Sequence, residues 1–348
     1  MRSRLRTVAI CLLTVGLLAF FLRNADWSAV WAETRRAQPL YLAGALLLTA
    51  LTYVIRAFRW QYLLAPLGSV RFGPAFRATV IGFAATFLLP ARAGEVIRPY
   101  LLARREGLPG TATFATVILE RLLDLVTALT LFATFVLLFD PRTVPGAAAH
   151  LPRVQLGGLL AAVVAIGALA VAFVAAGHPE RLGRLALRVE RVLPARAARV
   201  VAGLVESFTT GLAVLRQPRR LLVSLALSLP LWLSIAAGIW LTSLAFHITF
   251  PFIASFLVMA ILVVGVAMPT PGAVGGFHAA YQIAVQAFFD TPDDRAIGAA
   301  IVLHAISFLP VTVAGILFMA QEGLSLRTLA AQAPGAGGAA APVPGATR

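Results

Sequence analysis

Long apolar runs alternate with short polar stretches along most of the chain. Six of the runs have the roughly 17 to 25 residues that an α-helix needs to cross the hydrocarbon core of a bilayer. Each is bounded by an arginine, a proline or a glycine, which are residues that mark the ends of such helices. The pattern predicts six membrane-spanning helices, at residues 5–22, 39–56, 113–139, 155–176, 220–246 and 297–320.

Two further apolar regions, residues 74–103 and 252–289, are interrupted near the middle. The first breaks at LLPARAG and the second at MPTPGAVGGF. Backbone that is not helical cannot face lipid, because each unpaired N–H or C=O group there costs several kcal/mol. We therefore expect both breaks to lie against protein or a watery cavity.

Arginine-rich stretches predict which loops face the cytoplasm, because cytoplasmic loops carry an excess of Lys and Arg. Residues 177–219 contain eight arginines against three glutamates, and the middle of this segment is typical of an amphipathic helix on the membrane surface. We place this segment, the N-terminus and residues 56–77 in the cytoplasm, and residues 140–153 outside. This requires each interrupted region to leave the membrane on the side where it enters. We expect re-entrant hairpins, and two full crossings by each region would meet the same requirement.

The order of span, span, hairpin and span in residues 1–153 recurs in residues 154–322 with inverted orientation. Inverted repeats with broken helices are typical of transporters. We therefore expect one transmembrane domain, residues 1–322, made of two inverted halves and followed by a disordered tail rich in Ala, Gly and Pro at 323–348. The residues that align at the two breaks are Pro90 with Pro271, Gly94 with Gly275, and Tyr100 with Tyr281.

Composition supports an all-α polytopic membrane protein, because 60% of the residues are hydrophobic and only 12% are charged. The formal net charge is +15, and every basic residue is arginine. Because these arginines lie between apolar spans, they favour anionic lipid headgroups over nucleic acid as partners. The start of the chain resembles a secretory signal, but no convincing cleavage site precedes Trp27, so we expect an uncleaved first helix in the cell's inner (cytoplasmic) membrane.

Enzyme signatures are few. Cys11 is alone, which excludes an internal disulfide and a cysteine metal cluster. The sequence shows no His, Asp and Glu at metal-ligand spacing, no phosphate-binding loop and no convincing nucleophile motif. We expect neither a metal nor a cofactor.

The first break, FLLPARAGEVIRP, carries charges where the chain is otherwise apolar. Pro90 ends a helix, Gly94 permits a turn, and the N–H groups of the next helix, which starts near Glu95, would form an anion site. Arg92 and Arg98 would flank that site, and Glu95 and Arg98 are spaced to pair with each other. The other interpretation is that these arginines only close a cytoplasmic loop.

Glu120, Arg121 and Asp124 lie inside the apolar stretch ATVILERLLDLVTALTL. An unpaired charge within a membrane costs about 2.5 kcal/mol or more, so these side chains should face the bundle interior and have partners. Arg92 or Arg98 would neutralise the two carboxylates. The set is either a structural ion pair between helices or a site for substrate or proton coupling.

The second break, PTPGAVGGFHAAY, is followed by His278, and His304 lies near the start of the last span. Imidazole at these positions could bind a headgroup phosphate, take up a proton, or only pack between helices. The segment RAFRWQYLLAPLG, residues 56–68, is typical of an arginine and aromatic anchor at the membrane interface. Arg59 could also contact a lipid phosphate at the cavity mouth.

The motifs RWQYLL, LLPARAGEVIRPYLL, ATVILERLLD and PTPGAVGGFH, in this order, resemble the lysylphosphatidylglycerol synthase transmembrane region family. The likeness covers about residues 5–322. It implies a lipid-handling module that in its best understood members moves aminoacylated phosphatidylglycerol between leaflets, and in others is associated with polyprenyl-linked glycans or glycolipids. The aminoacyl-transfer domain of full-length synthases is missing from this sequence, so we expect no synthesis of lysyl lipid by this chain alone.

The resemblance also assigns residues. The family's third motif usually contains a further glycine and a later glutamate, but Ala273 and His278 stand there in this chain, which puts carboxylate-dependent proton coupling at this hairpin in doubt. The positions that match the three motifs are Arg92, Gly94, Glu95 and Arg98, then Glu120, Arg121 and Asp124, then Pro269, Pro271, Gly272 and Gly275.

These observations predict a lipid translocase that binds a phosphate-bearing headgroup in a polar intramembrane cavity. Two alternatives remain open. One is a membrane glycosyl- or phosphotransferase acting on a polyprenyl phosphate, with Glu120 or Asp124 as base. The other is a scaffold for a separate lipid-modifying enzyme. The predicted substrate-binding residues are Arg59, Arg92, Gly94, Glu95, Arg98, Tyr100, Glu120, Arg121, Asp124, Pro271, Gly272, Gly275, His278 and His304.

Overall fold

The computed structural model describes residues 26–89, 92–138, 147–178, 180–182, 195–268 and 270–324. Within these ranges the regular structure is entirely helical. The predicted first span at residues 5–22, the prolines Pro90 and Pro269, and nearly all of the predicted tail at 323–348 lie outside the described residues.

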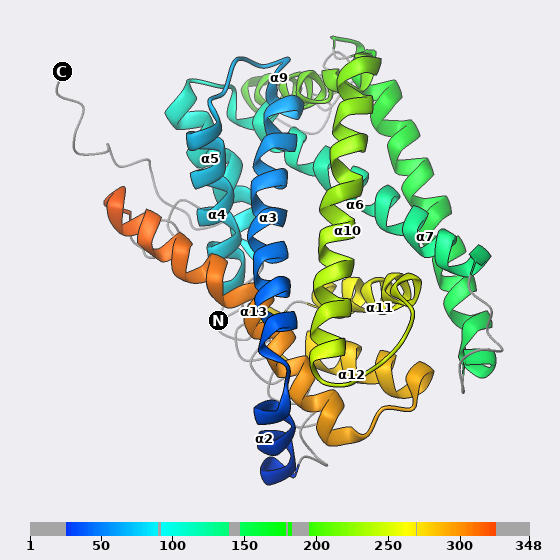
Figure 1. Cartoon of the computed structure of the whole chain (residues 1–348). Coiled ribbons are helices and arrows are strands. Elements are labelled where there is room, and N and C mark those ends of the chain that lie inside the picture. Colours follow the sequence, from blue (N-terminus) through cyan, green and yellow to red (C-terminus); the bar gives the residue numbers. More distant parts are fainter. Residues whose placement is uncertain are drawn as a thin grey trace.

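Five helices among the described residues are long and apolar enough to cross a membrane. They confirm five of the six predicted spans, and the sixth lies outside the described part. Two of them extend well beyond their predictions. The helix that begins at residue 39 continues to residue 64 instead of 56, and the helix predicted at 155–176 begins at residue 147. The five are α3 (Pro39–Leu64), α6 (Gly110–Leu138), α7 (Ala147–Ala176), α10 (Pro218–Ala245) and α13 (Asp293–Gln321) (Figure 1).

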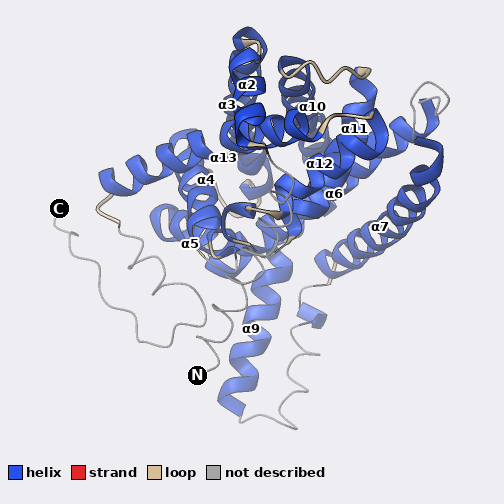
Figure 2. Cartoon of the chain, turned by 90° about the horizontal axis from the view of Figure 1, so that it is seen from below, coloured by secondary structure: helices blue, strands red, loops and turns tan. Residues whose placement is uncertain are grey.

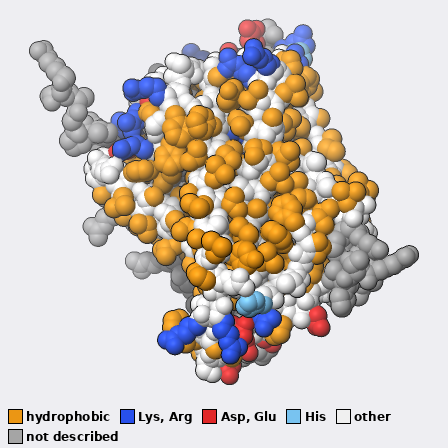
Figure 3. All heavy atoms as spheres, viewed as in Figure 1, with side chains coloured by type: hydrophobic (Ala, Val, Ile, Leu, Met, Phe, Trp, Pro, Cys, Tyr) orange, Lys and Arg blue, Asp and Glu red, His pale blue; other side chains and the backbone are white. Residues whose placement is uncertain are grey.

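The molecular surface has the distribution that a bilayer demands. Figure 3 shows hydrophobic side chains covering the middle of one face, with charged side chains gathered toward its two ends. On α7, large apolar side chains such as Leu160 and Val164 are 59% and 67% exposed. An exposed apolar face of this size is stable in lipid and not in water. The chain is therefore an all-α, multi-pass membrane protein.

Each interrupted region forms a helical hairpin. The first consists of α4 (Phe72–Leu88) and α5 (Gly94–Glu106). The second consists of α11 (Ser255–Ala267), which follows the short helix η5 (Phe252–Ala254), and α12 (Gly276–Phe289), with the 3-10 turn η6 (Pro271–Ala273) between them. At 1.5 Å per residue these helices are about 20 to 26 Å long, which is shorter than the hydrocarbon core of about 30 Å.

Both hairpins return to the end of the bundle from which they start. In the first, the chain before α4 meets the chain after α5, because Gly68 lies against the side chain of Leu108. In the second, the rings of Phe250 and Phe289 stack with centroids 4.5 Å apart. Figure 1 shows α4 and α5 in the upper part of the molecule and α11 and α12 in the lower part. The two breaks therefore approach each other from opposite ends.

Glycines let the two arms of each hairpin touch. A Cβ atom added to Gly94 would overlap the carbonyl oxygen of Gly82, and one added to Gly276 would lie 2.6 Å from the carbonyl oxygen of Gly265. The close approach in the second hairpin is thus made by Gly276, one residue after the Gly275 that aligns with Gly94. Gly275 instead provides the turn, with φ of 84°.

Three further elements lie at the edges of the bundle: α2 (Trp27–Arg36), α9 (Ala195–Gly211) and η4 (Ala213–Arg216). The sequence did not predict α2, whose N-terminus is capped by the carboxylate of Asp26; the N–H groups of Ser28 and Ala29 donate to it. A helix, α9, lies in the middle of residues 177–219, as expected, and packs on α6 where Gly211 meets Ala112. Its position on the membrane surface stays a prediction. Figure 2 shows α7 and α9 at the periphery.

The centre of the molecule is formed by α3 and α10. They are joined by a hydrogen bond of 2.7 Å between the hydroxyls of Thr52 and Ser234, both buried. On another side, α13 packs closely on α4, because Gly315 faces Val80 and Ala84. These contacts leave a space between the central helices and the two hairpin tips.

Candidate functional site

Six charged side chains from three helices meet in the interior. We call them the arginine cluster: Arg56 and Arg59 on α3, Arg98 on α5, and Glu120, Arg121 and Asp124 on α6. Residues three or four apart share one face of a helix, so the spacing on α3 and on α6 directs both sets inward.

The arginines converge on a single oxygen atom. Glu120 Oε1 lies 2.9 Å from Nη1 of Arg98 and 3.4 Å from Nη1 of Arg56. Nitrogens of Arg121 and Arg59 lie 3.5 and 3.6 Å from the same oxygen. One carboxylate oxygen therefore holds four guanidinium groups together.

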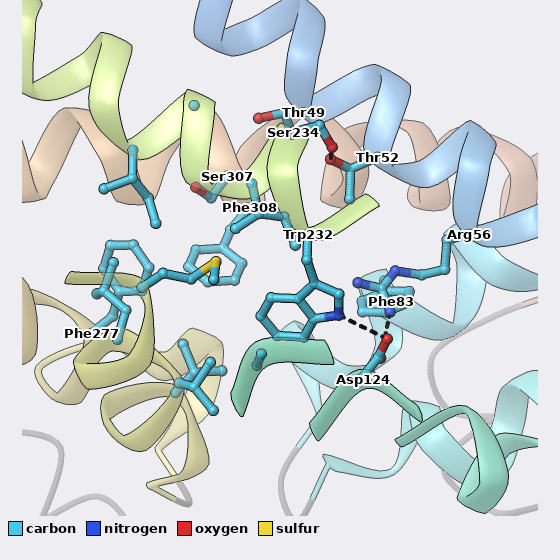
Figure 4. Close-up of a pocket in the computed structure, with 18 of the residues that line it drawn as sticks. Thr49, Thr52, Arg56, Phe83, Asp124, Trp232, Ser234, Phe277, Ser307 and Phe308 are labelled. Atoms are coloured by element: carbon cyan, nitrogen blue, oxygen red, sulfur yellow. Dashed lines mark hydrogen bonds and ion pairs between the residues drawn. The ribbon is translucent and has the colours of Figure 1, made fainter. Parts of the chain in front are cut away.

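Asp124 joins the same cluster to α10. Its Oδ1 lies 2.6 Å from Nη1 of Arg59, and its Oδ2 lies 3.2 and 3.5 Å from Arg56 and Arg121. The indole N–H of Trp232 donates to Oδ1 at 3.1 Å. Figure 4 shows Asp124 between Arg56 and Trp232 at the edge of a cavity.

Aromatic rings fix the orientation of the guanidinium groups. Arg98 stacks over Trp60 at 3.9 Å from the ring centre, and Arg56 and Arg121 lie 4.9 and 5.6 Å from the centre of Phe83. Arginine suits this arrangement because its planar group can stack on a ring and still donate hydrogen bonds from its edge, which lysine cannot do.

The prediction that residues 56–68 form an interfacial anchor is wrong for the arginines. Arg56, Arg59 and Trp60 are 6%, 0% and 0% exposed, and they belong to the C-terminal part of α3. Charged groups at the end of an apolar run resemble a loop in sequence. Here their partners lie on α6, more than 60 residues away.

A cavity of about 350 Å³ opens beside the arginine cluster. Its volume lies within the usual range of small-molecule sites, about 300 to 1,000 Å³. Its lining contains four charged side chains, Arg56, Arg92, Arg121 and Asp124. Figure 4 shows two of them, Arg56 and Asp124, side by side. Most of the remaining lining is apolar and aromatic, with a few hydroxyls; it includes Thr49, Thr52, Phe83, Phe87, Ser234, Met259, Leu262, Phe277, Leu303, Ser307 and Phe308.

Arg92 connects the tips of the two hairpins. Its Nη2 pairs with Glu95 at 2.9 Å, and its Nη1 donates to the carbonyl oxygen of Val266, near the end of α11, at 3.3 Å. The predicted pairing of Glu95 with Arg98 is therefore wrong. Of the two arginines expected to neutralise Glu120, Arg98 does so, whereas Arg92 has other partners.

Several predicted site residues lie away from the cavity lining. Gly94 begins α5 and packs on Gly82, so its role is in helix contact. The hydroxyl of Tyr100 accepts a hydrogen bond of 3.0 Å from the exposed Arg104. Neither residue is among those that line the cavity, and the same holds for Arg59, Arg98 and Glu120.

The two histidines form a stacked pair, with ring centroids of His278 and His304 4.5 Å apart. His304 Nε2 lies 2.8 Å from the carbonyl oxygen of Gly272, so Nε2 is the protonated nitrogen. His278 Nδ1 accepts from the N–H of Gly275 at 3.3 Å. The pair does not line the cavity; the ring of Phe277, which does, lies against both imidazoles.

The turn in the second hairpin is conformationally unusual. Gly272 has φ of 62°, and Ala273 has φ of 56°, in the left-handed region where glycine is favoured. The motif resemblance implies a glycine where this chain has Ala273, and a positive φ is one that glycine adopts at lower cost than alanine. Pro271 opens this turn on the side of the cavity where α4 ends, and Phe87 of α4 lies beside Gly272.

Arg56, Phe83 and Trp232 are among the cavity residues that sequence reasoning missed as site residues. The last two carry no recognisable signal, since an aromatic residue in an apolar helix is usually packing. Arg56 did carry one, because Arg56 and Arg59 repeat the i, i+3 spacing of a helix face. No group of three or more His, Cys, Asp or Glu residues that could hold a metal occurs among the described residues.

Two relatives are similar to this chain in sequence: one is named as a glycosyltransferase and the other as a membrane protein. Glycosyltransferase AglD of Haloferax volcanii is 27% identical over an alignment that covers 93% of this chain and 56% of that protein. A UPF0104 membrane protein, MJ1595 of Methanocaldococcus jannaschii, is 35% identical over 99 residues, 28% of this chain and 29% of that protein. The chain thus spans about half the length, or less, of the curated relatives it matches.

A family model matches residues 7–315, which include every helix of the arginine cluster and both hairpins. That model is described as the lysylphosphatidylglycerol synthase transmembrane region, in agreement with the resemblance of the sequence motifs. The chain belongs to the lysylphosphatidylglycerol synthase transmembrane region family.

Proposed function

We propose that this protein moves an anionic lipid between the leaflets of its membrane and holds the phosphate of the headgroup at the arginines of the cavity lining. The observation that carries the proposal is the charged part of the cavity lining, in which three arginines, Arg56, Arg92 and Arg121, stand against one carboxylate, Asp124. Guanidinium groups bind phosphate through paired, charge-assisted hydrogen bonds. The apolar remainder of the cavity suits the adjoining acyl or prenyl chain.

The hairpins supply a route for alternating access. We propose that each is re-entrant, that they enter from opposite sides, and that they belong to two inverted halves of the chain. Support comes from their shortness, from their return to the end where they begin, and from the contact between Arg92 and Val266 at their tips. Rocking of the halves about this contact would open the cavity first to one side and then to the other.

The test is a leaflet assay in proteoliposomes. Phosphatidic acid that carries a fluorescent acyl chain is placed in both leaflets, and dithionite added outside reduces only the outer probe. We expect the parent protein to expose the inner probe, and Arg56→Gln to lose most of this activity. Arg104→Gln, which alters an exposed arginine on α5, is the control. Lipid movement equal to that of protein-free vesicles, or equal in parent and Arg56→Gln, would contradict the proposal.

A second candidate function is a membrane glycosyl- or phosphotransferase. It is favoured by the name of the relative from Haloferax volcanii, which is a glycosyltransferase. In that case Asp124, which lies at the edge of the cavity, would act as the base. Incubation of the purified protein with a polyprenyl phosphate and radiolabelled nucleotide sugars distinguishes the two, because only an enzyme transfers the label to lipid.

The same variants distinguish a translocase from the third candidate function, a scaffold for a separate lipid-modifying enzyme. For a scaffold, Arg56→Gln would change stability or association with the partner enzyme and leave the movement of lipid as it is without protein. For a translocase, lipid movement itself would fall.

A further inference from the structure

The arginine cluster contains more hydrogen-bond donors than acceptors. Six of its guanidinium nitrogens are buried with no hydrogen-bond partner: Nε of Arg56, Arg59, Arg98 and Arg121, and Nη2 of Arg59 and Arg98. On the acceptor side, a single carboxylate oxygen, Glu120 Oε2, lacks a partner. Four of these nitrogens belong to Arg59 and Arg98, which do not line the cavity, and two belong to Arg56 and Arg121, which do. Buried polar groups are usually paired, so the unpaired donors of Arg56 and Arg121 indicate that an acceptor comes from the cavity.

Formal charge shows the same imbalance. Four guanidinium groups face two carboxylates, which leaves two positive charges in excess within the cluster. The neighbouring Glu95 does not correct this, because it pairs with Arg92. Uncompensated charge within a membrane is costly, so an anion of matching charge would be stabilised there.

We propose that the bound headgroup carries two negative charges, as a terminal phosphate or a diphosphate does, and that this charge is the basis of specificity. The inference rests on the function proposed above and narrows its substrate. A phosphomonoester has a charge of about −1.5 to −2 near neutral pH and three acceptor oxygens. A phosphodiester headgroup has half that charge. An aminoacylated phosphatidylglycerol adds an ammonium group, for which the cavity offers one carboxylate that already has three arginine partners.

Arg121 is the residue that the geometry assigns to this discrimination. Its side chain is 32% exposed, it lines the cavity, and its contacts with the two carboxylates are the longest of the hydrogen bonds in the cluster, 3.5 Å each. Arg59 and Arg98, in contrast, are held by shorter contacts of 2.6 and 2.9 Å. Arg121 can therefore turn toward a phosphate without disrupting the pairs that hold the helices.

Binding to lipids with identical acyl chains tests the proposal. Native mass spectrometry of the detergent-purified protein would compare phosphatidic acid, phosphatidylglycerol and lysyl-phosphatidylglycerol. A hydrogen bond to a charged group contributes about 1.5 to 3 kcal/mol, so we expect phosphatidic acid to bind about tenfold or more tightly than phosphatidylglycerol, with the lysyl lipid weakest. In Arg121→Gln the preference for phosphatidic acid should fall severalfold.

Two controls separate the possible outcomes. Arg104→Gln should keep the preference of the parent, and a thermal melt should show that Arg121→Gln is folded. Competition with inorganic pyrophosphate at millimolar concentration shows whether the site takes a lipid or a soluble anion. If it displaces phosphatidic acid as effectively as an equal concentration of that lipid does, the ligand is a soluble dianion, and the lipid assignment is overturned.

Failure of this inference differs from failure of the proposed function. If phosphatidylglycerol or its lysyl derivative binds as tightly as phosphatidic acid and is moved between leaflets, the protein is a translocase and the charge rule is wrong. If Arg121→Gln is folded and keeps the full preference, the assignment to Arg121 is wrong. If no lipid is bound selectively and none is moved, both proposals fall.

Discussion

The two oxygens of the Glu120 carboxylate have unequal surroundings. Oε1 lies within 3.6 Å of nitrogens from four arginines, whereas Oε2 is buried without a hydrogen-bond partner. Glu120 therefore acts as a shared counter-charge that allows like charges from three helices to stay together. The structural and the functional interpretations of the buried charges are compatible, because the same cluster both joins helices and faces the cavity.

Replacing Glu120 by Gln should be strongly destabilising. Removing one partner from a buried ion pair costs about 3 to 5 kcal/mol, because the remaining charge is left uncompensated. The partly exposed pair of Glu95 and Arg92 offers a matched control, and Glu95→Gln should cost less than about 1 kcal/mol. Thermal unfolding in detergent measures both variants. Equal losses would show that the cluster is not a buried, low-dielectric network.

Trp232 is placed to report on the cavity through its fluorescence. Its indole donates to Asp124 and its ring lines the cavity, so binding of phosphatidic acid should change its emission. Trp232→Phe should remove that change and, by loss of a hydrogen bond to a charged group, about 1.5 to 3 kcal/mol of stability. Trp240→Phe is the control, since Trp240 donates to the carbonyl oxygen of Phe250 and does not line the cavity. A response lost in Trp240→Phe and kept in Trp232→Phe would place the lipid elsewhere.

At the scale of helices, the tight crossing in the first hairpin depends on the absence of a side chain. Gly94→Ala should destabilise the protein, because the new Cβ would meet the backbone of Gly82 and Thr86, which cannot move aside as a flexible side chain can. Gly167→Ala on α7 is the control. Nothing lies within 4 Å of a Cβ at Gly167, and alanine favours a helix over glycine by about 1 kcal/mol. In thermal unfolding, Gly94→Ala should lower the unfolding temperature and Gly167→Ala should raise it. An unchanged unfolding temperature for Gly94→Ala would mean that the hairpin arms are less closely packed.

Helix length and apolar composition were sufficient to predict the five spans in the described part of the chain, because a bilayer imposes both on any crossing segment. The C-terminal extension of α3 was missed for a physical reason. Arg56 and Arg59 resemble the charges of a cytoplasmic loop until their partners on α6 are known, and no local pattern names partners so distant in the chain. For the same reason Glu95 was paired with Arg98 by helical spacing, whereas Arg98 turns toward Glu120.

At the scale of the whole molecule, the proposed topology places α2 and α9 on opposite sides of the membrane, as they lie at opposite ends of the bundle in Figure 1. Single cysteines at the exposed positions Ser28 and Thr210, in a Cys11→Ser background, test this. A membrane-impermeant maleimide added to intact cells should label Ser28→Cys and leave Thr210→Cys unlabelled until the cells are opened. Labelling of both positions from outside would overturn the cytoplasmic placement of residues 177–219.

The order of the charged residues along the chain also bears on how the protein is made. During synthesis, α3 brings Arg56 and Arg59 to the membrane before the ribosome has translated Glu120 and Asp124 on α6. Until then each arginine lacks its partner, and an unpaired arginine at the centre of a membrane helix costs about 2.5 to 3.5 kcal/mol. The nascent α3 should therefore remain beside the insertion machinery, or keep its arginine end among the headgroups, until α6 arrives. A chain that stops just before α6 would carry three arginines without their partners, because Arg98 on α5 also pairs with Glu120, and we expect cellular quality control to recognise it by these charges.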